Sequence, residues 1–357
     1  MRSDLVHLVD ELAERRALPV EGYQALVEGA DSELRGLAAR RAFEERRRVF
    51  GDAVYVRGLI EISSHCRNDC LYCGLRRSNA SCQRYRLSTE KIMACVDEGY
   101  ELGFRTFVLQ GGEDLAFDDE RLCDVVARIK RAHGDCAVTL SVGERPREVY
   151  QAFHDAGADR FLLRHETADP AHYARLHPAE MSHAHRLACL RDLREVGFVI
   201  GCGFMVGSPH QTARNIALDL KFIEGLRPEM CGIGPFVPHH ATPFAHEPAG
   251  SADLTCFLLS LLRLQNPNVL LPATTALATV EGDGRERGML AGANVVMPNL
   301  SPADAREKYL LYDGKASSGS EAAEGLADLR RRMAGIGLRV VVDRGDPPHA
   351  TAAGTAI

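Results

Sequence analysis

The segment HCRNDCLYCGLRRSN (65–79) carries three cysteines, Cys66, Cys70 and Cys73, in the spacing C-x3-C-x2-C. Thiolates grouped in one short loop can hold zinc or an iron–sulfur cluster. A structural zinc ion needs a fourth protein ligand, and Cys82 or His65 is close enough in the sequence to supply it. Zinc ligands, however, usually come as two short pairs separated by about a dozen residues or more. A four-iron cluster on three cysteines would instead leave one iron open to a small chelating molecule, and we favour this interpretation.

The composition narrows the setting in which such a site would work. The chain has 357 residues, of which 45% are hydrophobic and 26% charged, as in ordinary globular proteins. Its net charge of −6 gives no basic surplus for nucleic acid, and no apolar run reaches the ~18 residues of a membrane span. The N-terminus lacks the apolar stretch of a signal peptide, and the eleven cysteines are an odd number. We therefore expect a cytoplasmic protein with reduced thiols and with no nucleic-acid or membrane partner.

Short apolar segments alternate with helix-length segments along most of the chain. Residues 1–50 show helical spacing of apolar residues that ends at Gly51. Eight candidate strands follow, at 57–63, 105–110, 137–143, 160–166, 198–207, 230–238, 268–275 and 293–299. This pattern predicts an α/β fold of the (β/α)8 TIM-barrel type, with a doubly wound open sheet as the alternative. The predicted organisation is an N-terminal helical extension (1–50), the barrel (51–330), and a C-terminal helix or strand remnant with a frayed tail (331–357).

The strands should bring particular side chains to the cysteine segment, because catalytic groups of such a barrel lie at the C-terminal strand ends. The cysteine segment follows the first strand directly and so belongs to that end. Alternate residues of a strand share a face, which sends two sets inward: Thr139, Ser141 and Gly143, and Leu162, Arg164 and Glu166. The inward face of 198–207 is Gly201, Gly203, Met205 and Gly207, which predicts open space, while Cys202 points outward. Four further cysteines, Cys95, Cys123, Cys189 and Cys256, fall on predicted helices as buried packing residues.

The cysteine spacing, with Tyr72 just before the last cysteine, resembles the signature of radical S-adenosylmethionine enzymes. In that superfamily S-adenosylmethionine chelates the open iron, and an electron from the cluster breaks its sulfonium bond to give a 5′-deoxyadenosyl radical. A glycine-rich end of the second strand meets the methionyl amino group there. QGGED (110–114) stands in that place, which assigns Gly111, Gly112 and Glu113 to the cofactor. The implied cofactors are a [4Fe-4S] cluster and S-adenosylmethionine.

Further stretches, among them RYRLSTEKI, LLRHETADP, FMVGSPHQT, GIGPFVPHHATP and GANVVMPNLSP, resemble the HydE family of [FeFe]-hydrogenase maturases, from about residue 10 to about residue 340. Methylornithine synthase and biotin synthase are the related families. The resemblance assigns Glu166 and Met205 to S-adenosylmethionine, Arg186 to its carboxylate, and Arg164 to an anionic group in the barrel. A purely structural ion pair between Arg164 and Glu166 is the alternative. The resemblance also places seven residues along the inner cavity: Thr139, Ser141, Thr274, Thr275, Met297, Tyr309 and Tyr312.

The resemblance also implies a reaction and partners. The substrate would be a cysteine-chelated iron carbonyl/cyanide synthon from the maturase HydG, whose sulfur the radical attacks to give a diiron precursor. HydF would be the acceptor, and ferredoxin or flavodoxin the reductant. A radical enzyme acting on an organic amino acid and a non-catalytic carrier of an iron fragment are the rival hypotheses.

Two local features limit how much of the family pattern applies. Some family members carry cysteines for a second cluster after the LYxGK stretch, where this chain has Ser317 and no cysteine, so we expect one cluster. His183 and His185 lie two residues apart, which does not suit one helix face, and we expect both to be solvated.

Overall fold

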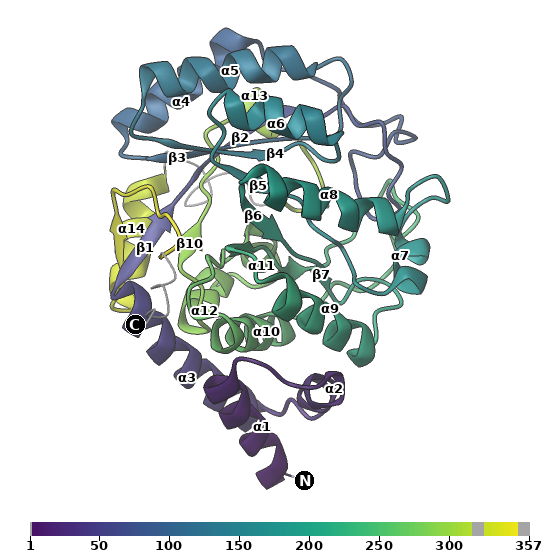
Figure 1. Cartoon of the computed structure of the whole chain (residues 1–357), viewed down its shortest axis with the longest axis vertical. Coiled ribbons are helices and arrows are strands. Elements are labelled where there is room, and N and C mark those ends of the chain that lie inside the picture. The colour runs from purple at the N-terminus through teal and green to yellow at the C-terminus, as the bar shows by residue number, and fades with distance from the viewer. Residues whose placement is uncertain (1, 316–324, 349–357) are drawn as a thin grey trace, which may run out of the picture.

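The computed structural model describes residues 2–315 and 325–348, with strands at the centre and helices outside them (Figure 1). Three helices come first, α1 (Arg2–Arg15), α2 (Val20–Glu28) and α3 (Ser32–Phe50). The Asp31 carboxylate caps α3 by accepting the Leu34 N–H at 2.8 Å, and Gly51 ends the helix with φ of 60°. These helices pack on the outside of the fold, where the Tyr23 hydroxyl donates to Glu224 at 2.9 Å.

Parallel strand pairings run around the centre in a closed ring. Six strands form one sheet in sequence order, β2 (Gly58–Ser63), β3 (Thr106–Gly111), β4 (Ala137–Ser141), β5 (Arg160–Leu162), β6 (Val199–Cys202) and β8 (Met230–Cys231). Single bridges complete the ring at Met230–Leu270, Pro272–Val295 and Leu59–Asn299. The predicted α/β barrel is therefore confirmed, although the seventh predicted strand is reduced to bridges.

Two predicted strands are each divided in two. Residues 198–207 form β6 and then β7 (Met205–Val206), and 230–238 form β8 and then β9 (Gly234–Pro235), which pairs with β7. The prediction that the glycines of 198–207 leave open space is wrong. A Cβ on Gly203 would lie 1.9 Å from the Gly232 carbonyl oxygen, and one on Gly201 would lie 2.6 Å from a Leu162 methyl carbon. These glycines allow neighbouring groups to approach closely.

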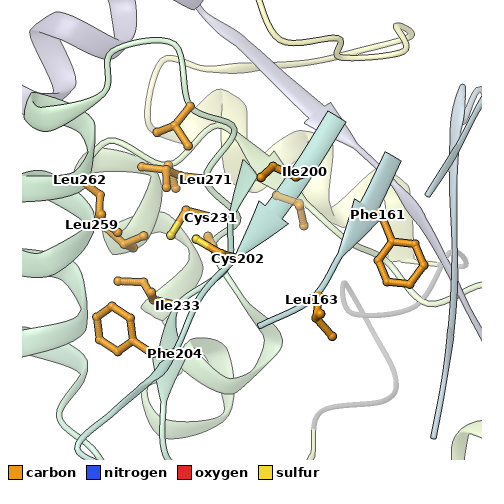
Figure 2. Packing of buried hydrophobic residues seen from close by; sticks show 14 of the residues in the cluster. Phe161, Leu163, Ile200, Cys202, Phe204, Cys231, Ile233, Leu259, Leu262 and Leu271 are labelled. Atoms are coloured by element: carbon orange, nitrogen blue, oxygen red, sulfur yellow. The ribbon is translucent and has the colours of Figure 1, made fainter. Parts of the chain in front are cut away.

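Helices between the strands cover the outside of the ring. They are α4 (Thr89–Glu101), α5 (Asp119–Ala132), α6 (Arg147–Asp155), α7 (Pro170–Leu176), α8 (His183–Val196), α9 (Ala213–Leu226), α10 (Ala252–Gln265), α11 (Thr275–Val280), α12 (Gly284–Leu290), α13 (Ala303–Arg306) and α14 (Leu326–Gly335). Cys202 points outward as predicted and packs with Cys231 and Leu259 in the core (Figure 2). The four cysteines predicted to lie on helices do so, and Cys95 and Cys189 are buried as predicted. Cys123 and Cys256 are only half-buried.

The N-terminal end of the ring is closed by the end of the described chain. A second sheet has the order β10–β1–β11, from β1 (Ala53–Val56), β10 (Val295–Val296) and β11 (Arg339–Val341). After β11, the carbonyl oxygen of Arg344 accepts hydrogen bonds from Thr106 Oγ1 at 2.6 Å and Arg160 at 2.9 Å. Arg160 also bonds Asp346 at 2.7 Å. Residues 343–346 are thus anchored to the barrel, which corrects the predicted frayed tail there.

The helices also bear on the question of a membrane. Within residues 2–315 and 325–348, none of them combines the length and apolar character needed to span a bilayer.

Candidate active site

A cavity of about 370 Å³ lies within the ring and is lined by the cysteine loop, which follows β2. Every residue that the sequence assigned to a site lines it: Cys66, Cys70, Tyr72, Cys73, Gly111, Gly112, Glu113, Thr139, Ser141, Arg164, Glu166, Arg186, Met205, Thr274, Thr275, Met297, Tyr309 and Tyr312. Strand parity and the family motifs therefore converge on one cavity, although the role of each residue there is a separate question.

The cysteine segment is fixed from several sides. The Arg67 N–H donates to the Glu113 carbonyl oxygen at 2.9 Å, and the Leu71 N–H donates to Leu176 at 3.0 Å. Further along the loop, the Gly74 N–H donates to the carbonyl oxygen of Leu311 at 2.9 Å. The cysteine loop is thus held by the segment just after β3, by the last residue of α7 and by the segment after α13.

The three cysteines fit an iron–sulfur cluster better than a single zinc ion. Burial raises the pKa of all three thiols, that of Cys73 to about 12. Tetrahedral zinc with bonds of about 2.3 Å would bring the sulfurs within ~3.8 Å of one another. In the part of the chain that the structure describes, the sulfurs of Cys66, Cys70 and Cys73 do not all lie within 4.8 Å of one another, so they are too far apart for one zinc ion. Cys82 and His65, the candidate fourth zinc ligands, do not line the cavity.

The glycine-rich end of β3 lies directly against the cysteine loop. A Cβ on Gly112 would stand 2.2 Å from the His65 carbonyl oxygen, so only glycine fits there. The Glu113 carboxylate pairs with Arg67 at 3.0 Å and accepts the Glu144 N–H at 3.0 Å. Gly143, with φ of 82°, makes room for this carboxylate, since a Cβ would lie 2.0 Å from Glu113 Cγ. The local backbone is therefore shaped around Glu113.

Arg186, in the first turn of α8, pairs with Glu144, a partner that the sequence did not reveal. Arg186 Nε lies 2.7 Å from Glu144 Oε1, and both side chains are almost fully buried. Burial raises the pKa of Glu144, while the nearby Arg186 charge acts in the opposite direction. Burial, the largest single effect, would lower the pKa of Arg186, but Glu144, Tyr173, Glu113 and Tyr72 together outweigh it and the net shift is upward. Arg186 therefore stays cationic at the cavity wall.

Arg164 and Glu166 form the ion pair that strand parity suggested, at 3.0 Å. The side chain of Arg164 is 34% exposed and lines the cavity, in the inward direction that the strand pattern predicted. Glu166 lies beyond the end of β5 with φ of 66°, a conformation that costs a non-glycine residue energy and often marks a functional site.

Tyr72 is oriented by His177. Its hydroxyl lies 3.2 Å from His177 Nε2, while His177 Nδ1 lies 3.0 Å from the Tyr173 carbonyl oxygen. Burial lowers the pKa of His177 to about 4, so the ring is neutral and its one hydrogen belongs on Nδ1. The Tyr72 hydroxyl therefore donates to His177.

Three charged residues of the cavity wall were missed. Arg57 is buried, one amino group lies 3.1 Å from the Met230 sulfur, and its Nε and Nη2 have no hydrogen-bond partner among the described residues. Glu61 and Lys315 form a buried ion pair. An arginine and a glutamate inside the first predicted strand were a usable signal, because buried charges need partners or a ligand.

The two histidines of α8 behave differently. His183 Nε2 lies 3.0 Å from the Thr167 carbonyl oxygen, so the prediction that it is solvated is wrong. His185 is exposed, as expected.

Comparison with known proteins agrees with this site. Residues 60–223 match the family model described as the radical SAM superfamily. The barrel and its cysteine loop define a radical S-adenosylmethionine enzyme, a class that uses a [4Fe-4S] cluster and S-adenosylmethionine. The chain is 46% identical over 274 residues to the "[FeFe] hydrogenase maturase subunit HydE" of Thermotoga maritima, covering 77% of this chain and 78% of that protein. It belongs to the HydE family of hydrogenase maturases.

Two more distant similarities agree with the related families expected. A 3-methylornithine synthase of Methanosarcina acetivorans is 27% identical over 338 residues, covering 89% of this chain and 91% of that protein. A crystal structure of methylornithine synthase (PylB) superposes with a TM-score of 0.81 at 25% identity, covering 94% and 97% of the two chains.

Proposed function

We propose that this enzyme converts a cysteine-chelated iron carbonyl/cyanide synthon, supplied by HydG, into a diiron precursor of the hydrogenase active site. One observation carries the proposal beyond family membership. Arg57, Arg164 and Thr139 line the cavity, and buried polar atoms of these side chains (Arg57 Nε and Nη2, Arg164 Nε and Thr139 Oγ1) have no hydrogen-bond partner among the described residues. Such groups are costly to leave unpaired, so they suit a small anionic or strongly polar ligand.

We assign the lining residues to two roles. Cys66, Cys70 and Cys73 would hold one [4Fe-4S] cluster, and Glu113, Glu166 and Arg186 would hold S-adenosylmethionine. Together these groups, when bound, supply a 5′-deoxyadenosyl radical. Thr139 of β4, Arg57 just before β2 and Arg164 just after β5 line the same cavity and would hold the synthon through its carboxylate and cyanide groups.

The protein's own contribution is positioning and exclusion of water. The forked guanidinium of Arg164 is suited to a carboxylate and would fix the synthon with respect to the cofactor. The anchored segment 343–346 closes the N-terminal end of the ring, which leaves the cysteine end for entry. A closed site protects a reactive radical from solvent.

The cluster number and the partners belong to the same proposal. We infer one cluster per chain, because the position that could begin a second cysteine set is Ser317, which lies outside the described residues. Ferredoxin or flavodoxin would supply electrons, and HydF would accept the product.

Anaerobic activation of an apo-hydrogenase in a defined maturation mixture tests the function. Arg164→Met should retain wild-type iron content but lose at least about tenfold in maturation rate, because a charge-assisted hydrogen bond contributes about 1.5–3 kcal/mol. Arg128→Met on the exposed face of α5 is the matched control and should mature hydrogenase normally. Wild-type maturation by a folded Arg164→Met protein would exclude its substrate role.

The rival functions give different products. The similarity to methylornithine synthase makes an organic substrate the second candidate. A methylornithine-type product formed from lysine would support it. A carrier would give no substrate-dependent 5′-deoxyadenosine.

A further inference from the structure

Three metal-ligating side chains meet beside the cavity, outside the cysteine loop. They are Glu144, from the segment after β4, and His185 and Cys189, from α8, and their ligand atoms all lie within 4.8 Å of one another. His185 Nε2 is 3.6 Å from Glu144 Oε2 and 3.6 Å from the Cys189 sulfur. Zinc with bonds of about 2.0–2.3 Å in tetrahedral geometry separates its ligand atoms by ~3.3–3.8 Å. The atoms therefore stand close to the spacing that one zinc ion needs.

The surroundings hold these side chains in place. His185 and Cys189 are four residues apart on one helix, so they share a face. The Arg145 N–H donates to the Tyr150 hydroxyl at 2.9 Å, and the Cys189 sulfur lies 3.9 Å from the Arg145 carbonyl oxygen, so the backbone of Arg145 and the ring of Tyr150 are fixed next to Cys189. Partners of this kind fix metal ligands and strengthen binding.

A second group of three possible ligands is formed by His239, His240 and Asp313. It is a poorer metal site, because the His239 nitrogen that faces Asp313 carries a hydrogen. His239 Nδ1 accepts the Ala241 N–H at 3.0 Å, so the hydrogen of the neutral ring is on Nε2, the atom that faces Asp313. A metal ligand needs the opposite arrangement, with the free lone pair towards the metal. His185 is 59% exposed, so water can take the hydrogen of Nδ1 and Nε2 is available.

We propose that Glu144, His185 and Cys189 bind one zinc ion, with a fourth coordination position open to solvent. A thiolate, an imidazole and a carboxylate form a mixed set that suits this borderline-soft cation. Glu144 Oε2 faces the metal position, while Oε1 faces Arg186 at 2.7 Å. The carboxylate thus serves two cations, one on each oxygen, and the zinc ion lies one carboxylate away from the cavity wall.

Zinc binding to the cluster-loaded protein tests the proposal. The holoprotein is dialysed anaerobically against buffered micromolar Zn²⁺, and zinc and iron are then measured together, so that any exchange of cluster iron is seen. We expect one zinc per chain with the iron content unchanged. Zinc-edge X-ray absorption, to which the iron cluster is silent, should show one sulfur among the ligands.

Variants separate this site from others. His185→Ala changes an exposed side chain and should weaken zinc binding at least about tenfold, and Cys189→Ser should remove sulfur from the zinc shell. His183→Ala, on the same helix, and Cys123→Ser should bind zinc as the wild type does. Melting curves check that each variant is folded. Undiminished binding by His185→Ala, a sulfur-free zinc shell in the wild type, or no bound zinc at all would overturn the proposal.

Discussion

The buried Lys315–Glu61 ion pair should make the stability of the barrel sensitive to the removal of one partner alone. The two side chains are 5% and 0% exposed. The Lys315 ammonium also donates to the Tyr309 carbonyl oxygen at 3.0 Å and lies 4.9 Å from the centre of that ring. Removing one member of a buried pair leaves the other charge unpaired, which costs about 3–5 kcal/mol. We expect Lys315→Met to lower the free energy of unfolding by that amount at neutral pH.

The loss should depend on pH in a defined direction. Burial raises the pKa of Glu61 from 4.5, and the Lys315 charge opposes that rise. Without the ammonium the folded-state pKa of Glu61 rises further, while the unfolded value stays near 4.5. A carboxyl group whose pKa is higher in the folded state than in the unfolded state stabilises the folded state at pH values below its unfolded-state pKa. This stabilisation is lost as the pH rises through its folded-state pKa. The difference in free energy of unfolding between the wild type and Lys315→Met should therefore shrink on acidification, by up to about 1.4 kcal/mol per pH unit.

Urea unfolding followed by circular dichroism under anaerobic conditions measures both effects. Lys315→Met/Glu61→Gln leaves no buried charge and should recover most of the loss. Lys91→Met, on the exposed face of α4, should change the free energy of unfolding by no more than about 0.5 kcal/mol. An unchanged midpoint for Lys315→Met at neutral pH, or an equal loss at every pH, would refute the reasoning.

Three further outcomes follow from the contacts around the cysteine loop. Gly112→Ala should reduce cluster iron strongly, because a Cβ has no room there, whereas Gly225→Ala, with nothing within 4 Å, should keep it; equal iron contents would contradict this. Asp114→Asn should lose about 2 kcal/mol of stability through its hydrogen bonds to Arg86 at 2.6 and 2.8 Å. Burial would raise the pKa of Asp114, but its hydrogen bonds, the strongest of them with Arg86, lower that pKa to about 2. In acid titrations, the wild type should therefore lose this stability between pH 3.8 and about 2, whereas the variant should not. Cys82→Ser should keep the full iron content, and loss of the cluster in that variant would make Cys82 a ligand.

The sequence by itself determined the features that depend on local order. Spacing alone grouped Cys66, Cys70 and Cys73 in one loop, and the alternation of apolar segments with helices predicted the barrel. Strand periodicity directed Thr139 and Arg164 inward, because neighbouring side chains on a strand must point to opposite faces. These inferences needed no partner from elsewhere in the chain.

Only the tertiary structure decided which distant groups meet. Glu144 reaches Arg186, Lys315 reaches Glu61, and segment 343–346 closes the barrel, although long stretches of chain separate the members of each contact. Burial of a charge can be suspected from a strand pattern, but its partner depends on how the ring closes. The same limit explains the error at Gly203. The missing side chain led us to predict empty space there, but the fold places the backbone of Gly232 against it.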